Sequence, residues 1–166
     1  MKELKRFCSF LVVAILFISC DKTIDFYTIQ GEAQGSTYSI KYISTEEKVT
    51  KNQIDSLLTA FDLSLSTYRP DSKISKINAG DSTVVVDEFF TETFQLSNQI
   101  YKETNGLFDP TIGVLVNAYG FGPNKKQENL SQKQIDSLLQ FVGFDKIVLN
   151  SNKTISKKHQ ETFIDF

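Results

Sequence analysis

Histidine, cysteine and tryptophan are the scarcest residues of this sequence, and their scarcity excludes several kinds of chemistry. The 166 residues contain one histidine, His159, and no tryptophan. The two cysteines, Cys8 and Cys20, both lie among the first twenty residues. The rest of the chain therefore has no disulfide, no cysteine-based zinc site and no thiol nucleophile. A single histidine also removes most Ser-His-Asp and histidine–metal schemes.

Net charge is low as well. Eighteen basic and twenty acidic residues leave a formal charge of −2, so no polyanion-binding field is expected and nucleic acid is not an expected partner. An apolar fraction of 40% and a charged fraction of 23% are ordinary for a folded soluble protein. Fourteen phenylalanines indicate a core built mainly from phenyl rings. The length leaves room for one domain or for part of a larger one.

The first nineteen residues have the composition of a sorting signal. Lys2, Lys5 and Arg6 precede an apolar run over residues 7–18. This run is shorter than the roughly 20 residues that a membrane-spanning helix needs, and its length is typical of the core of a signal peptide. The run ends just before Cys20, and polar residues follow.

The residues before Cys20 resemble a bacterial lipoprotein box, in which the cysteine is lipidated and becomes the first residue. We therefore expect residues 1–19 to be a lipoprotein signal peptide and Cys20 to carry the acyl chains, palmitate among them. The protein would be exported and held on the cell membrane, facing the periplasm or the exterior, without spanning it. The alternative is an ordinary signal peptide with an incidental cysteine.

Hydrophobic periodicity predicts mixed helices and strands after the signal segment. The predicted strands are residues 26–31, 37–43, 84–86, 147–149, 154–156 and 162–166. The predicted helices are residues 50–66, 72–78, 87–104 and 131–142. Because the two kinds of element mix without a strict βαβ rhythm, we expect an α+β fold in which helices pack on a largely antiparallel sheet.

Capping residues support the predicted helix ends. Ser72 and Asp87 are suitable N-caps, and Ser131 with Gln134 has the spacing of a capping box. The pair at residues 105–106, Asn-Gly, is typical of a helix C-terminus.

Residues 104–123 have the composition of a shaped loop. Four glycines and two prolines lie within these twenty residues. Glycine allows a backbone to approach a ligand closely, and exposed backbone N–H groups can hold phosphate or carbonyl oxygens. Asp109 supplies an anionic acceptor for a ligand hydroxyl or N–H group. The alternative is an Asp-Pro turn that opens a small helix, with Asp109 as its N-cap.

Two further loops are weaker candidates. Residues 31–38 form a glycine-containing bend between two predicted strands, and most such bends are only turns. Tyr68 lies in a polar loop at 65–72, where its ring either stacks on a planar ligand or covers a helix end. Residues 157–159, Lys-Lys-His, are interpreted as a solvated turn.

Taken together and in order, these segments resemble the ApbE family of FAD:protein FMN transferases. Residues 33–38 (Ala-Gln-Gly-Ser-Thr-Tyr) resemble the family's Ala-Met-Gly-Thr-x-Tyr bend. Residues 66–78 carry the matching Ser, Tyr, Ile and Asn positions of its second element. Residues 104–122 resemble its Thr-x-Gly-x-Phe-Asp-x-Thr motif and the Gly-Phe-Gly that follows. Residues 164–166 (Ile-Asp-Phe) resemble the opening of a later glycine-rich motif.

The resemblance implies an enzyme that moves FMN from FAD onto a Ser or Thr hydroxyl of an acceptor flavoprotein subunit, with Mg²⁺ bound at the pyrophosphate. It also implies an ApbE-like, T-fold-like architecture. The positions that it assigns to FAD contact are Gln34, Tyr68, Leu107, Phe108, Asp109 and Asp165. Gln34 departs from the family pattern, which has methionine there.

The family pattern continues beyond the last residue of this sequence. We therefore expect residues 20–166 to be the N-terminal part of a longer, here truncated, flavin transferase domain. Catalytic residues and Mg²⁺ ligands are expected beyond Phe166, and these 166 residues alone are expected to be inactive. One alternative is a non-catalytic surface lipoprotein that binds a flavin or a protein, and another is a structural lipoprotein with coincidental loops.

Overall fold

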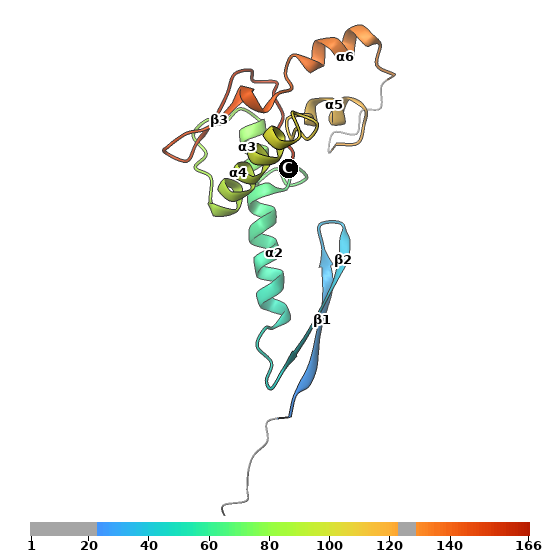
Figure 1. The fold of residues 1–166 in the computed structure, drawn as a ribbon, viewed down its shortest axis with the longest axis vertical. Helices are drawn as coiled ribbons and strands as arrows, with labels where there is room; N and C mark the ends of the chain where they lie inside the picture. The colour runs from blue at the N-terminus through green and yellow to red at the C-terminus, as the bar shows by residue number, and fades with distance from the viewer. Residues whose placement is uncertain (1–22, 123–128) are drawn as a thin grey trace, which may run out of the picture. The chain divides into compact units, whose positions relative to one another are not determined.

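The structure is a computed structural model that describes residues 23–122 and 129–166. The signal segment at 1–19 and Cys20 lie outside the described residues. The chain divides into two compact units, Met1–Ile54 and Asp55–Phe166. Each unit is described by itself, and Figure 1 follows the chain through both.

The described part of the N-terminal unit contains a long β-hairpin. Strands β1 (Asp25–Ala33) and β2 (Ser36–Ser44) pair antiparallel along their full length, so both predicted strands are confirmed and extend further than predicted. Gln34 and Gly35 form the two-residue turn, and both have positive φ angles, 54° and 73°. Two such residues are typical of the type I′ turn, whose twist matches that of the strands. Tyr27 and Tyr42 stack across the ladder with their ring centroids 5.2 Å apart.

Helix α2 (Lys51–Leu65) begins in the N-terminal unit and continues into the C-terminal unit. Thr50 and Gln53 hold the start of α2, because they exchange side chain–backbone hydrogen bonds. Two more helices follow it, α3 (Lys73–Asn78) and α4 (Glu88–Glu103).

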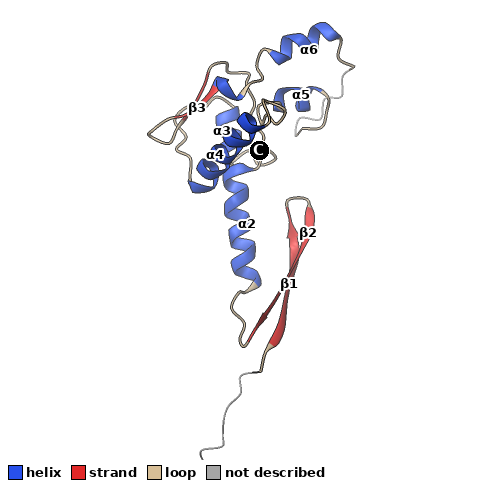
Figure 2. Ribbon diagram, viewed as in Figure 1, coloured by secondary structure: helices blue, strands red, loops and turns tan. Residues whose placement is uncertain are grey.

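The later elements of the C-terminal unit are shorter. They are α5 (Gly113–Ala118), α6 (Gln132–Leu139), the 3₁₀ turn η1 (Phe144–Lys146), β3 (Ile147–Leu149) and β4 (Ile155–Lys157). Strands β3 and β4 pair antiparallel. Within the described residues the regular strands therefore form two antiparallel pairs. Figure 2 colours the helices blue and the strands red. None of the helices in the described ranges is long and apolar enough to cross a membrane.

The core of the C-terminal unit is rich in phenyl rings, as the composition predicts. The rings of Phe94 and Phe144 lie 4.9 Å apart, and those of Phe90 and Phe166 lie 5.3 Å apart. Phe90 and Ile74 are fully buried. The buried cluster consists of Leu65, Ile74, Ile77, Val86, Phe90, Phe94, Phe144, Ile147, Ile155 and Ile164.

The predicted helix ends are confirmed at most positions. Ser72 and Asp87 accept hydrogen bonds from the backbone at Ser75 and Phe90, and Ser131 forms the capping box with Gln134. The Asn-Gly pair at 105–106 has positive φ angles, and the amide of residue 106 donates to the carbonyl oxygen of residue 101 across the helix end.

Three predicted boundaries or elements are wrong. Residues 84–86 form no strand, although the amide of Val86 donates to the carbonyl of Lys153 at 2.8 Å. Residues 162–166 also form no strand, and only one parallel bridge, Ile112 to Phe163, is made there. Helix α6 ends at Leu139, three residues before the predicted end. Val86 and Ile164 are apolar because they are buried in the core, although neither belongs to a regular strand.

Candidate functional site

The loop after helix α4 presents two apolar side chains outward. The Thr104 hydroxyl donates to the carbonyl of Ile100 at 2.7 Å and accepts from the amide of Phe108 at 3.1 Å. This local bracing holds the turn in which Leu107 is 93% exposed and Phe108 is 38% exposed. Leu107 and Phe108 therefore offer apolar surface to solvent.

Asp109 forms a tight turn with Thr111. One oxygen of its carboxylate, Oδ1, accepts from the Thr111 amide at 2.8 Å and from the Thr111 hydroxyl at 2.6 Å. The fully buried Thr111 hydroxyl accepts in turn from the amide of Gly143 at 2.6 Å. Helix α5 begins later, after Ile112, without a side-chain cap. The interpretation of Asp109 as an N-cap is therefore wrong, and its carboxylate instead stabilises the turn.

The end of the chain lies beside this loop. The amide of Asp165 donates to the carbonyl of Pro110 at 2.8 Å, and Phe163 bridges to Ile112. Gly113 makes the close approach possible, because a Cβ atom there would lie 2.5 Å from Cδ1 of Phe163. The segments around Asp109 and Asp165, more than fifty residues apart in sequence, therefore meet.

The third candidate loop meets the same segments. The buried Thr67 donates its hydroxyl proton to Oδ1 of Asp165 at 3.2 Å, and the Tyr68 hydroxyl donates to the carbonyl of Phe121 at 3.4 Å. Tyr68 is nonetheless 67% exposed. A ring that is anchored at its hydroxyl and open elsewhere retains surface on which a planar ligand can stack.

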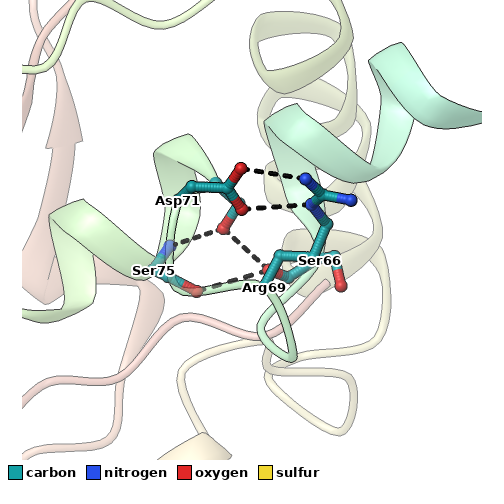
Figure 3. A network of polar contacts seen from close by, with 5 residues as sticks. Ser66, Arg69, Asp71 and Ser75 are labelled. Carbon is teal, nitrogen blue, oxygen red and sulfur yellow. Dashed lines mark hydrogen bonds and ion pairs between the residues drawn. The ribbon is translucent and has the colours of Figure 1, made fainter.

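A polar network braces the loop that carries Tyr68 (Figure 3). The Ser72 hydroxyl donates to the carbonyl of Ser66 at 2.7 Å, and the Ser75 hydroxyl reaches the same carbonyl at 3.3 Å. Arg69 and Asp71 form a bidentate pair at 2.9 and 3.1 Å. Because Ser72 also caps helix α3, the loop is attached to a packed element rather than free at both ends.

The carboxyl group of Asp165 is half-buried, and this affects its ionisation. Burial raises the pKa of Asp165 above that of an ordinary aspartate, while the hydrogen bond from Thr67 opposes the rise. A carboxyl group in such an environment is typical of functional sites.

Five of the six residues assigned to FAD contact lie in the C-terminal unit. There the amide of Asp165 donates to Pro110, the residue after the loop at 107–109, and Thr67, next to Tyr68, donates to the Asp165 carboxylate. The Tyr68 hydroxyl donates to the carbonyl of Phe121. That these five residues contact FAD stays a prediction. Gln34 belongs to the N-terminal unit, where residues 32–37 line an open depression of about 490 Å³ at the hairpin turn. Its part in the same site stays a prediction.

Several residues that support the site were not singled out from the sequence. Thr67, Thr111 and Asn78 all lie inside the motif segments, but nothing in their spacing indicated that their side chains would bond across the fold. The interpretation of Lys157 as part of a solvated turn is wrong. It ends strand β4, is half-buried, and its ammonium group donates to three backbone carbonyls.

Apolar, aromatic and acidic side chains all occur in the part of the candidate site that the structure describes. They offer exposed apolar and aromatic surface beside two carboxylates on braced loops. Across 23–122 and 129–166, no group of three or more His, Cys, Asp or Glu side chains is arranged to hold a metal ion. The expectation that Mg²⁺ ligands lie beyond Phe166 stays a prediction.

Known proteins resemble this chain in both sequence and structure. The FAD:protein FMN transferase of Haemophilus influenzae is 30% identical to it, over 99% of this chain and 51% of its own length. That of Vibrio cholerae is also 30% identical, over 93% of this chain and 48% of its own length. The solved flavin transferase ApbE from Vibrio cholerae superimposes with a TM-score of 0.76 at 26% identity, covering 86% of this chain and 48% of that one. The flavinyl transferase ApbE of Pseudomonas stutzeri, solved in its apo form, superimposes with a TM-score of 0.74 at 26% identity. The match covers 87% of this chain and 49% of that one.

The α+β fold class is confirmed by these structures, and the chain spans about half the length of the relatives that it matches. The family model described as "ApbE family" matches residues 34–166, which contain all six residues assigned to FAD contact. This chain therefore belongs to the ApbE family.

Proposed function

We propose that the full-length protein transfers FMN from FAD to a Ser or Thr hydroxyl of an acceptor protein. The observation that carries the proposal is the braced loop at 107–109, which lies beside Asp165 and displays apolar side chains to solvent. Its relatives named FAD:protein FMN transferase support the same reaction class.

In the proposed reaction, the acceptor hydroxyl oxygen attacks the FMN-side phosphorus of FAD. A new P–O ester bond forms, the pyrophosphate P–O bond breaks, AMP leaves and the hydroxyl proton is released. Such a transfer depends mainly on positioning and on neutralising charge. Mg²⁺ would supply that neutralisation at the pyrophosphate, through ligands expected beyond Phe166.

The residues of this chain would bind and orient FAD. The Tyr68 ring would lie against a ring system, and Leu107 and Phe108 would cover another apolar face of the ligand. The carboxylates of Asp109 and Asp165 would accept hydrogen bonds from ligand hydroxyl or N–H groups. Because both carboxylates are already held by threonine hydroxyls, they would lose little freedom when FAD binds.

The proposal is tested with the full-length protein, FAD, Mg²⁺ and an acceptor domain. We expect an acceptor that carries acid-stable flavin fluorescence and one AMP released per flavin transferred. The 166 residues alone, assayed in parallel, are expected to transfer no flavin. Absence of both flavin transfer and AMP release from the full-length protein would refute the proposal.

A matched pair of leucine variants tests the binding site itself. Leu107→Ser should weaken FAD binding roughly tenfold, because burying a leucine side chain is worth about 1.5–3 kcal/mol. Leu139→Ser changes an exposed leucine on helix α6, outside the site, and should leave FAD binding within about twofold. Equal FAD affinities for the two variants would remove the loop at 107–109 from the site.

A non-catalytic flavin-binding protein is the second candidate. Gln34 favours it, because an amide stands where the family pattern has methionine. Tight FAD binding by the full-length protein without AMP release would select this candidate over the enzyme.

The cellular location is a separate proposal. The basic start, the apolar run and Cys20 support an exported protein anchored to the membrane by acyl chains. An exported flavin transferase would meet acceptor flavoproteins at the same membrane surface.

A further inference from the structure

The backbone that leads to Asp165 is held by side chains rather than by a β-ladder. Residues 162–166 form no strand, yet Ile164 is fully buried. Its amide donates to Oδ1 of Asn78 at 2.9 Å, and its carbonyl accepts from Nδ2 of Asn78 at 2.8 Å. The Asn78 carboxamide therefore makes the two bonds that a neighbouring strand would have made.

Lys157 holds the same segment from a second direction. Its ammonium group donates to the carbonyl of Gln160 at 2.7 Å, to that of Thr162 at 3.0 Å and to that of Asn78 at 3.3 Å. An ammonium group has three donors, so these carbonyls match its full capacity. Lys157 thus joins the end of helix α3 to the segment at 160–164.

Because Lys157 is half-buried, losing any of its three hydrogen bonds would lower the free energy of unfolding. Burial lowers the pKa of Lys157, although the nearby Glu161 carboxylate opposes the change. A half-buried ammonium group is tolerated where its donors are satisfied. Here the acceptors are backbone carbonyls, so the charge of Lys157 fixes the path of the chain.

These contacts end directly at the candidate site. The residue after Ile164 is Asp165, whose amide donates to Pro110 and whose carboxylate accepts from Thr67. A shift of Ile164 would move the Asp165 carboxylate relative to Tyr68 and to the loop at 107–109. Displacements of about 1 Å at a site are enough to change binding and catalysis strongly.

We propose that Asn78 and Lys157 are positioning residues for FAD binding, which hold the backbone at 160–164 so that the Asp165 carboxylate faces the ligand. This inference rests on the proposed function. Neither side chain needs to touch FAD; both act through Asp165.

A double-mutant cycle on the full-length protein tests the inference. Lys157→Met and Asn78→Asp should each weaken FAD binding about tenfold in the otherwise unchanged protein. In an Asp165→Asn background, where the carboxylate is already absent, each should weaken it by less than about twofold. A purely structural role would give the same loss of affinity in both backgrounds.

Two further measurements separate positioning from loss of stability. Ile155→Val truncates the core on the same strand as Lys157 without touching its contacts, and should leave FAD affinity within about twofold. Hydrogen exchange at the Ile164 amide should accelerate at least tenfold in Asn78→Asp without FAD present, because the carbonyl of Ile164 then faces a carboxylate.

The outcomes distinguish the two proposals. If the unchanged full-length protein does not bind FAD, the proposed function fails and this inference fails with it. If it binds FAD but the losses of affinity are equal in the two backgrounds, only the positioning role is overturned. A loss of affinity confined to the protein that retains Asp165, with faster exchange at Ile164, supports the positioning role.

Discussion

Asp165 combines two properties at the scale of a single residue. Its half-buried carboxyl group has a raised pKa, and its backbone is held by the neighbouring loops. A raised pKa means that the folded state binds the proton more tightly than the unfolded state does. The ionised form present at neutral pH therefore lowers the free energy of unfolding.

Asp165→Asn should consequently stabilise the protein at neutral pH. The neutral amide can still accept from Thr67 through its carbonyl oxygen, and it avoids the cost of a buried charge. Because water still screens the half-exposed carboxyl group, we expect a gain below about 1 kcal/mol in the free energy of unfolding. Urea unfolding of both proteins across pH measures it.

The pH dependence supplies the control for this prediction. The stabilisation by Asp165→Asn should shrink as the pH falls through the raised folded-state pKa and vanish below the ordinary aspartate value of 3.8. If the gain in the free energy of unfolding instead stays constant at acidic pH, it comes from packing rather than from the charge of Asp165. FAD binding should weaken in the same variant, so that stability rises while function falls.

A second prediction concerns Gly113, where neighbouring atoms leave no room for a side chain. In Gly113→Ala, the new Cβ atom would lie 2.5 Å from Cδ1 of Phe163 and 3.1 Å from the Phe163 carbonyl oxygen. One of these segments must move, and we expect a loss of about 1–3 kcal/mol in the free energy of unfolding. Thermal or urea unfolding measures it, and FAD affinity should fall as well.

A second substitution tests the cause of that loss. In a Phe163→Ala background the ring is absent, so Gly113→Ala should cost less, although the carbonyl oxygen still limits the space. An equal cost in both backgrounds would show that the ring is not what Gly113 accommodates.

At the scale of elements, one helix-capping side chain also bonds to a second helix, and another caps its own helix alone. Asp87 accepts at one carboxylate oxygen from the amide of Phe90 at 3.1 Å and from the hydroxyl of Ser64 at 2.6 Å. Ser64 is fully buried at the end of helix α2, so Asp87 ties α2 to the start of α4. Ser131 caps α6 in an exposed position and has no such second contact in the described structure.

Asp87→Ala should therefore cost more than Ser131→Ala. The first removes a cap worth about 1 kcal/mol and leaves a buried hydroxyl without its partner, for a total of about 2–3 kcal/mol. The second removes an exposed cap and should cost about 0.5–1 kcal/mol. Urea unfolding compares them, and similar costs would contradict the assigned link between α2 and α4.

At the scale of the whole molecule, the proposed anchor at Cys20 determines where the protein acts. If acyl chains on Cys20 hold the exported protein, Cys20→Ser should release it from the membrane fraction into the soluble fraction. The reason is that each buried CH₂ group contributes about 0.8 kcal/mol to anchoring. Fractionation and labelling with a radioactive or clickable palmitate measure the change.

Cys8→Ser is the matched control, because it changes the other cysteine inside the apolar run. Its product should remain membrane-bound and labelled. An unchanged protein that is soluble and carries no palmitate label would instead select the alternative of an ordinary signal peptide with an incidental cysteine.

The sequence by itself determined the local elements of this protein. The hairpin turn at 34–35, the cap at Ser72 and the capping box at Ser131 were all predictable, because each depends on residues within a few positions of one another. The motif order also indicated the family and the loop at 107–109, since glycine, proline and aspartate at fixed spacings describe one backbone shape.

Only the tertiary structure decided how distant segments meet. Residues 162–166 have the apolar pattern of a strand, but Asn78 and Lys157 supply their hydrogen bonds in place of a ladder. The Thr111 hydroxyl that donates to Asp109 also accepts from the amide of Gly143, thirty-two residues away. The bonds from Asn78 to Ile164 and from Gly143 to Thr111 join residues whose separation in sequence carries no periodic signal, and they form only once the folded core has brought both partners together.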